Sequence, residues 1–176
     1  LPGDRSELNW TEFHPFEAMP MLIAPPSGFV ANANHSPFRA TTGEWNLDPA
    51  DFEGLGIDTE MTNRGLRLLE LYGGDASITA SEFHRYKYDK QYSSESEAER
   101  VVAEVLSLDF ADDALLAAAQ KHLAEWDFDV ELDDRQAALG VLTATPVIIA
   151  ERQGLEPPEV EQAFRDAVSS LMKHHG

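Results

Sequence analysis

Two asparagines one residue apart, Asn32 and Asn34, have the residue type and setting that could do chemistry in this chain. They end a short apolar run that begins at Phe29, and His35 follows them directly. A side-chain amide held at the end of an extended segment presents two N–H donors to one point. Fixed donors of this kind stabilise the negative oxygen of a tetrahedral intermediate in acyl transfer. Asparagine is also common in turns, so a plain surface turn is the competing interpretation.

Other chemistries have little support in the sequence. The absence of cysteine excludes disulfides, thiolate metal sites and a cysteine nucleophile from this chain. The histidines include no pair at helical metal-ligand spacing, and the acidic stretch "DFDVELDD" lacks the spacing of an EF-hand loop. There is no glycine-rich phosphate loop and no Gly-x-Ser-x-Gly elbow. We therefore expect no metal and no cofactor.

The charge balance limits the partners that the chain can have. The 176 residues carry a formal net charge of −19, from 32 acidic against 13 basic side chains. A surface that follows a phosphate backbone needs clustered lysine and arginine, and an anionic membrane would repel this chain. We expect no nucleic acid and no membrane partner, and we interpret the charge as an aid to solubility.

The elements that must position the two asparagines lie in a turn-rich region, residues 1–57. Short strands are predicted at residues 21–23 and from 29 to 32 or 34, joined by the turn Pro25-Pro26-Ser27-Gly28. Pro37 is expected to end regular pairing. This small β element at about residues 21–34 would hold Asn32 and Asn34 at a strand end.

The second region, residues 58–176, is expected to contain about six helices, so the chain is predicted to be mostly α. The first is predicted from Asp58 or Thr59 to about Tyr72, and Thr79 with Glu82 forms a capping box for the next. Later helix starts are predicted at a second capping box (Ser94–Glu97), at Asp112, in the apolar run 135–154 with a kink or break near Pro146, and at Pro157-Pro158.

The stretch "FHPFEAMPMLIAPPSGFVANANHSPFRAT", followed by "EMTNRGLRLLEL", resembles the penicillin acylase family, in its acyl-homoserine-lactone acylase and aculeacin acylase branch. The resemblance covers at least residues 1–95. These enzymes are N-terminal nucleophile hydrolases, so the resemblance implies that the chain is a piece of an α+β (αββα) fold. It implies one structural unit cut from a larger protein.

The resemblance also implies roles for individual residues. Asn34 matches the family's oxyanion-hole asparagine, and Arg64 matches the arginine that orders the catalytic site. Asn32 and His35 would be supporting residues, and His35 stands where many relatives have a second asparagine. The family nucleophile is a serine at the first position of the β chain, but this chain begins with Leu1. We therefore expect an internal β-chain segment that is inactive alone.

For the complete protein, the resemblance implies an enzyme that cleaves linear amides, such as N-acyl-homoserine lactones, penicillins or lipopeptide side chains. Its partners would be the remainder of the acylase α and β chains and a small-molecule amide substrate. Export to the periplasm or secretion is implied by the family alone. The alternative is a self-standing acidic helical module that binds another protein without catalysis, with the Asn-x-Asn element as a surface turn.

Overall fold

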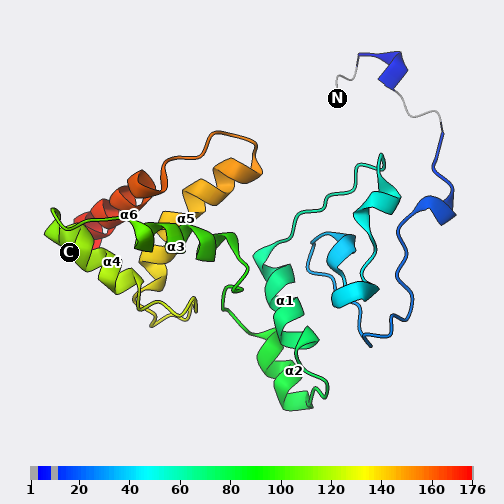
Figure 1. The fold of residues 1–176 in the computed structure, drawn as a ribbon, viewed down its shortest axis with the longest axis horizontal. Helices are drawn as coiled ribbons and strands as arrows, with labels where there is room; N and C mark the ends of the chain where they lie inside the picture. Colours follow the sequence, from blue (N-terminus) through cyan, green and yellow to red (C-terminus); the bar gives the residue numbers. More distant parts are fainter. Residues whose placement is uncertain (1–3, 9–11, 176) are drawn as a thin grey trace. The chain divides into compact units, whose positions relative to one another are not determined.

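The computed structural model describes residues 4–8 and 12–175, and the chain divides into two compact units, residues 1–61 and 62–176 (Figure 1). The described part is mostly helical, as predicted. Every α-helix in it lies in the second unit, whereas the first unit is built from turns and short 3-10 helices.

Five short 3-10 helices connected by irregular backbone lie in the described residues of the first unit. Phe38 is buried and its ring contacts that of Phe52, with centroids 5.7 Å apart. Thr41 is also buried, and its hydroxyl donates a hydrogen bond to the carbonyl of Phe29 at 2.9 Å. These contacts form a small interior for the loop that carries the asparagines. The helices are η1 (Ser6–Leu8), η2 (Phe16–Ala18), η3 (Pro37–Arg39), η4 (Gly43–Trp45) and η5 (Pro49–Phe52).

The predicted β element at residues 21–34 is not present, because no described residue belongs to a β-strand. The predicted turn is present: the Gly28 N–H donates to the carbonyl of Pro25 at 3.0 Å. Beyond the turn, the Ala31 N–H donates to the carbonyl of Ala40 at 2.7 Å. Left-handed backbone at Ala24 and Asn34 interrupts the extended segments. A ladder needs repeated pairing, and the described residues supply no second strand.

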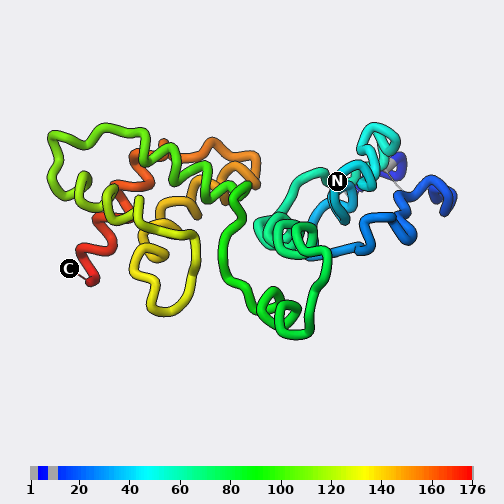
Figure 2. Tube along the Cα trace, turned by 60° about the horizontal axis from the view of Figure 1, so that its bottom comes forward, coloured from blue at the N-terminus to red at the C-terminus, as the bar shows by residue number. Residues whose placement is uncertain are grey.

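The second unit is a helical assembly whose core lies between α3, α5 and α6. Figures 1 and 2 show these helices side by side. Phe164 of α6 is fully buried, and its ring contacts that of Phe110, with the two ring centroids 5.4 Å apart. Each such side chain contributes roughly 1.5–3 kcal/mol through burial. The helices are α1 (Asn63–Gly73), α2 (Ala80–Lys87), α3 (Glu97–Ser107), α4 (Ala114–Leu123), α5 (Ala137–Arg152) and α6 (Val160–His175).

Close packing in the first turn of α5 explains the glycine at position 140. A Cβ on Gly140 would lie 2.2 Å from Cζ3 of Trp126. The indole is fixed, since its Nε1–H donates to the carbonyl of Asp129 at 2.7 Å and its ring contacts Tyr92 and Phe128. No side chain larger than hydrogen fits at position 140 without moving the ring.

Helix starts follow the capping residues, and several differ from the prediction. The capping box of Thr79 and Glu82 is confirmed, with both reciprocal hydrogen bonds formed. The first helix begins four or five residues later than predicted, because Thr62 is the residue whose hydroxyl accepts from the Gly65 N–H. Asp58 instead accepts from the nearby Glu60 N–H.

Neighbouring residues of the same type account for two further shifts. Ser96, not Ser94, caps α3, and Asp113, not Asp112, caps α4. Pro157 and Pro158 precede α6 rather than opening it, and α6 begins at Val160. The run that was predicted to kink or break near Pro146 is not broken there, because one α-helix continues through that residue. Pro146 is exposed, so water can satisfy the carbonyl one turn earlier that loses its N–H donor.

Candidate active-site residues

The backbone of Asn34 is left-handed, with φ of 56°. Its N–H donates to Oδ1 of Asn32 at 2.8 Å, a local side-chain-to-backbone bond that closes a tight turn. Asparagine tolerates this backbone region better than most residues because its short polar side chain can bond locally. The hydrogen bond from Asn32 thus holds the backbone of Asn34, and this backbone sets the direction of the Asn34 side chain.

His35 braces the same turn from the other side. The Ala33 N–H and Nδ1 of His35 are 3.0 Å apart, and Nε2 lies 3.0 Å from the carbonyl oxygen of Arg39. A backbone N–H can only donate, so Nδ1 must accept, and the ring proton belongs on Nε2, where it is donated to Arg39. The imidazole therefore bridges the two ends of the turn, which is a supporting position.

The residues after the turn are anchored by buried contacts. Ser36 is buried; its hydroxyl accepts from the Phe38 N–H at 3.2 Å, and its own N–H donates to the carbonyl of Glu60 at 3.3 Å. Asn32 and Asn34 themselves are exposed. The unit thus presents an exposed Asn-x-Asn turn on an anchored base.

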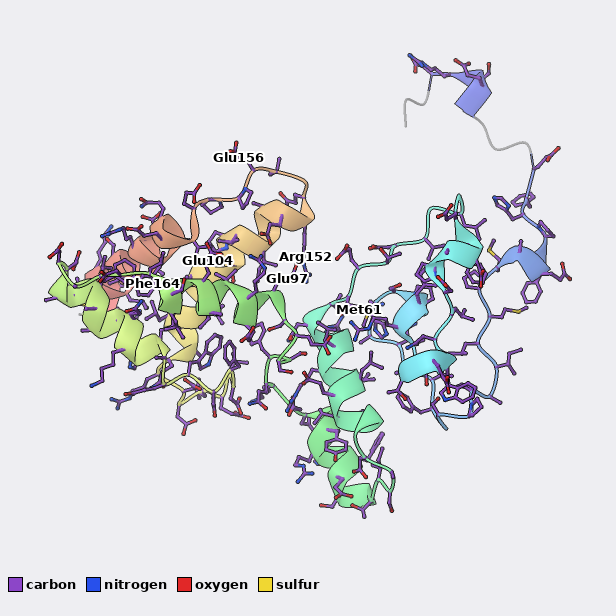
Figure 3. The ribbon with its side chains drawn as sticks, viewed as in Figure 1. Met61, Glu97, Glu104, Arg152, Glu156 and Phe164 are labelled. Atoms are coloured by element: carbon purple, nitrogen blue, oxygen red, sulfur yellow. The ribbon has the colours of Figure 1, made fainter. Side chains whose placement is uncertain are left out.

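Arg64 lies in the second unit, at the second residue of α1, and is exposed. It lines a cleft of about 360 Å³ whose other walls come from Tyr92, the first turn of α3 and the last turns of α5. Glu97 and Arg152, which form an ion pair, also line it. Figure 3 shows these two labelled side chains lying together. Arg64 therefore belongs to a hollow formed by three helices.

The residues next to Arg64 form a polar cluster that the sequence did not reveal. The guanidinium of Arg67 donates to both carboxylate oxygens of Asp89, at 2.8 and 2.9 Å, and to Glu70 at 3.1 Å. Glu70 Oε1 accepts from the Ser93 hydroxyl at 2.7 Å, and Oδ1 of Asn63 accepts from the Ser93 N–H at 2.8 Å. We call these five residues the α1 clamp, because they fasten α1 to residues 89–93.

The electrostatics of the α1 clamp favour its charged state. The hydrogen bonds to Asp89 raise the pKa of Arg67, so the guanidinium stays charged. The same pairing lowers the pKa of Asp89 below its ordinary value of 3.8. Burial acts to raise the pKa of Glu70, but hydrogen bonds from Ser93, Ser94 and Arg67 outweigh it and lower the pKa below 4.5. Both carboxylates are therefore ionised at neutral pH.

The acidic stretch after α4 has a structural use. Oδ1 of Asp127 accepts from the Asp129 N–H at 3.0 Å, and Oδ1 of Asp134 accepts from the N–H of Ala137 at 2.9 Å, next to the start of α5. Within residues 4–8 and 12–175, no group of three or more acidic or histidine side chains could hold a metal ion. Over the same residues, no helix has the length and apolar character needed to cross a membrane.

The predicted site residues thus belong to two different units. Asn32, Asn34 and His35 come together in one turn of the first unit. Arg64 belongs to the second unit, beside the α1 clamp. The signal for the clamp was present as the spacing of Asn63, Arg67 and Glu70, which are four and three residues apart and so share a helix face.

The Asn-x-Asn motif and Arg64, on which the resemblance to a hydrolase family was based, thus lie in a tight turn and at the start of a helix, respectively. The family model for penicillin amidase matches residues 1–170 of the 176. The chain belongs to the penicillin amidase family. Membership implies a hydrolase of the amidohydrolase type for the complete protein.

Proposed function

We propose that this chain supplies the oxyanion-hole asparagine, Asn34, to an enzyme that cleaves linear amide bonds. The observation that carries the proposal is the backbone of Asn34, held left-handed by the hydrogen bond to Asn32. A donor on a backbone fixed before the reaction loses little freedom when charge develops, and this preorganisation makes such donors effective.

The nucleophile in this proposal is a serine at the start of the β chain, outside these 176 residues. Its own α-amino group, which titrates near pH ~8, accepts the hydroxyl proton. The serine oxygen attacks the amide carbonyl, and the carbonyl oxygen becomes negative. The Asn34 amide and a backbone N–H donate to that oxygen. The C–N bond then breaks, the amine leaves with the proton, and water hydrolyses the acyl-enzyme.

Arg64 has a different role in the proposal. A guanidinium keeps its charge at any physiological pH and offers several donors in a fixed plane. At the start of α1, it would order the nucleophile's end of the site rather than bind the oxyanion. Its exposed position in a cleft agrees with a residue that another part of the complete protein approaches.

We propose N-acyl-homoserine lactones, penicillins or lipopeptide side chains as the substrate class, with the remaining acylase chains as partners and a periplasmic or secreted location. The family match over residues 1–170 favours this function over the acidic interaction module. By the same proposal, these 176 residues alone are inactive, because the serine is outside them.

The test is hydrolysis by the complete, self-processed protein of amides from all three substrate classes, with the released acids followed by mass spectrometry. Release of an acid from at least one class supports the proposal. A correctly processed protein that leaves every amide intact, including simple phenylacetyl and fatty-acyl amides, contradicts it. Cell fractionation tests the proposed location.

A further inference from the structure

We infer that the α1 clamp positions Arg64 for catalysis, so that Arg67, Glu70 and Asp89 are positioning residues of the active site. The inference rests on the role proposed above for Arg64. It extends the site from one arginine to a partly buried network that holds the helix on which this arginine lies.

The clamp is arranged along one face of α1. Asn63, Arg67 and Glu70 follow one another at spacings of four and three residues, which places them on one side of the helix. Arg64 is the neighbour of Asn63 in the first turn. A restraint on Asn63 therefore restrains the backbone that carries Arg64.

Three separate anchors fasten this face to residues 89–94. Near the start, Oδ1 of Asn63 accepts from the Ser93 N–H. One turn later, Arg67 forms a two-pronged pair with Asp89 and also donates to Oε1 of Gln91 at 2.7 Å. Further on, Glu70 accepts from the Ser93 hydroxyl, and the Ser94 N–H and hydroxyl add bonds to the same oxygen at 2.9 and 2.7 Å. Anchors spread along the helix prevent both rotation and sliding.

The anchored segment also forms the cleft that Arg64 lines. Tyr92, which lies in this segment, lines the cleft, and so does Ser96, which caps α3 and lies two residues beyond the segment. The Tyr92 N–H donates to the carbonyl of Phe128 at 2.9 Å, so this wall is itself tied to the core. The α1 clamp thus sets the distance between Arg64 and the opposite walls of the cleft.

The clamp differs in environment from the other ion pairs of the unit. The side chains of Arg67 and Asp89 are 22% and 19% exposed, whereas those of Arg165 and Glu161 on α6 are 41% and 48% exposed. Exposed pairs at helical spacing contribute little, because water and salt screen them. A bidentate arginine–carboxylate pair that is shielded from water holds the two side chains in one relative orientation, and lysine cannot form such a pair. Arg165 therefore provides a matched control.

The test is a double-mutant cycle in the complete enzyme, with Arg67→Lys and Arg64→Ala measured singly and together on one amide substrate. A small displacement of Arg64 from its working position should slow the reaction, so Arg67→Lys should lower kcat by about tenfold. In the Arg64→Ala background, the same change should lower kcat by less than about twofold, since the group that it positions is gone. Arg165→Lys should leave kcat within about twofold in both backgrounds.

Equal losses from Arg67→Lys in both backgrounds would overturn the inference and leave the proposed function intact. Full kcat in Arg64→Ala alone would instead remove the proposed role of Arg64, and the inference with it. If Arg67→Lys does not yield folded enzyme, Ser94→Ala serves the same cycle. It removes one exposed donor to Glu70 and should lower kcat by about twofold, again only where Arg64 is present.

Discussion

The side-chain oxygen of Asn32 accepts the backbone N–H of Asn34 at 2.8 Å, and residue 34 is left-handed. The first amide of the Asn-x-Asn motif therefore acts on the backbone of the second. The two asparagines thus have different roles, since Asn32 shapes the turn and Asn34 carries the amide that is proposed to meet the oxyanion.

Asn32→Ala in the complete enzyme should lower kcat by about tenfold, because the turn loses its acceptor and Asn34 loses its fixed direction. Asn32→Ser should retain more of the rate, since a hydroxyl can accept from the same N–H two residues on. Steady-state kinetics on one amide substrate measure both. Identical kcat for Asn32→Ala and the unmodified enzyme would contradict the supporting role of Asn32.

Glu70→Gln should destabilise the helical unit at neutral pH by about 1 to 2 kcal/mol, because hydrogen bonds to a charged acceptor are weakened. The pKa of Glu70 is lower in the folded chain than its ordinary value of 4.5, so its stabilisation is present above that pH. It is lost as pH falls through the folded-state pKa. The difference between variant and unmodified chain should therefore shrink below pH 4.5.

Urea unfolding followed by far-ultraviolet circular dichroism, at neutral pH and at several acidic values, measures this difference. Glu104→Gln, on the exposed side of α3, is the control and should change little at any pH. If Glu70→Gln lowers the free energy of unfolding by the same amount down to the lowest pH, the charge of Glu70 is not the source of the stabilisation.

Gly140→Ala tests the packing of α5 against Trp126. Alanine is favoured over glycine in a helix by roughly 0.5–1 kcal/mol. The added methyl group would lie 2.2 Å from an indole that is held by a hydrogen bond and two ring contacts. Overpacking of this kind costs about 1–3 kcal/mol, so the clash should prevail and the melting temperature should fall.

The exposed neighbour Ala138 supplies the control for this experiment, and Ala138→Ser should change stability by less than about 1 kcal/mol. An unchanged or higher melting temperature for Gly140→Ala would mean that the indole can move aside at little cost.

Local signals in the sequence predicted local structure well. The capping box of Thr79 and Glu82, and the turn closed by Gly28 and Pro25, are decided by atoms a few residues apart, and both are present. Where two neighbours could serve equally, as with Asp112 and Asp113, the sequence could not choose between them.

Features that depend on distant residues were not predictable. The strands expected at residues 21–34 need partner strands to pair with. A local pattern of apolar residues does not indicate whether such a partner is available. Arg67 pairs with Asp89, which is 22 positions away in the sequence. No sequence pattern around either residue indicates that the two side chains pair. Asn34 and Arg64 were proposed as site residues by resemblance, because an oxyanion donor has no local pattern that separates it from an ordinary turn asparagine.

The most direct measurement is the kcat of the complete enzyme carrying Asn34→Gly. Glycine adopts the left-handed backbone of residue 34 without strain, so the turn is kept and the carboxamide alone is removed. If this amide donates to the oxyanion, kcat should fall by about 10²–10³, with an unchanged melting temperature. A kcat within about twofold of the unmodified enzyme, in a fully folded and self-processed protein, would contradict the assignment.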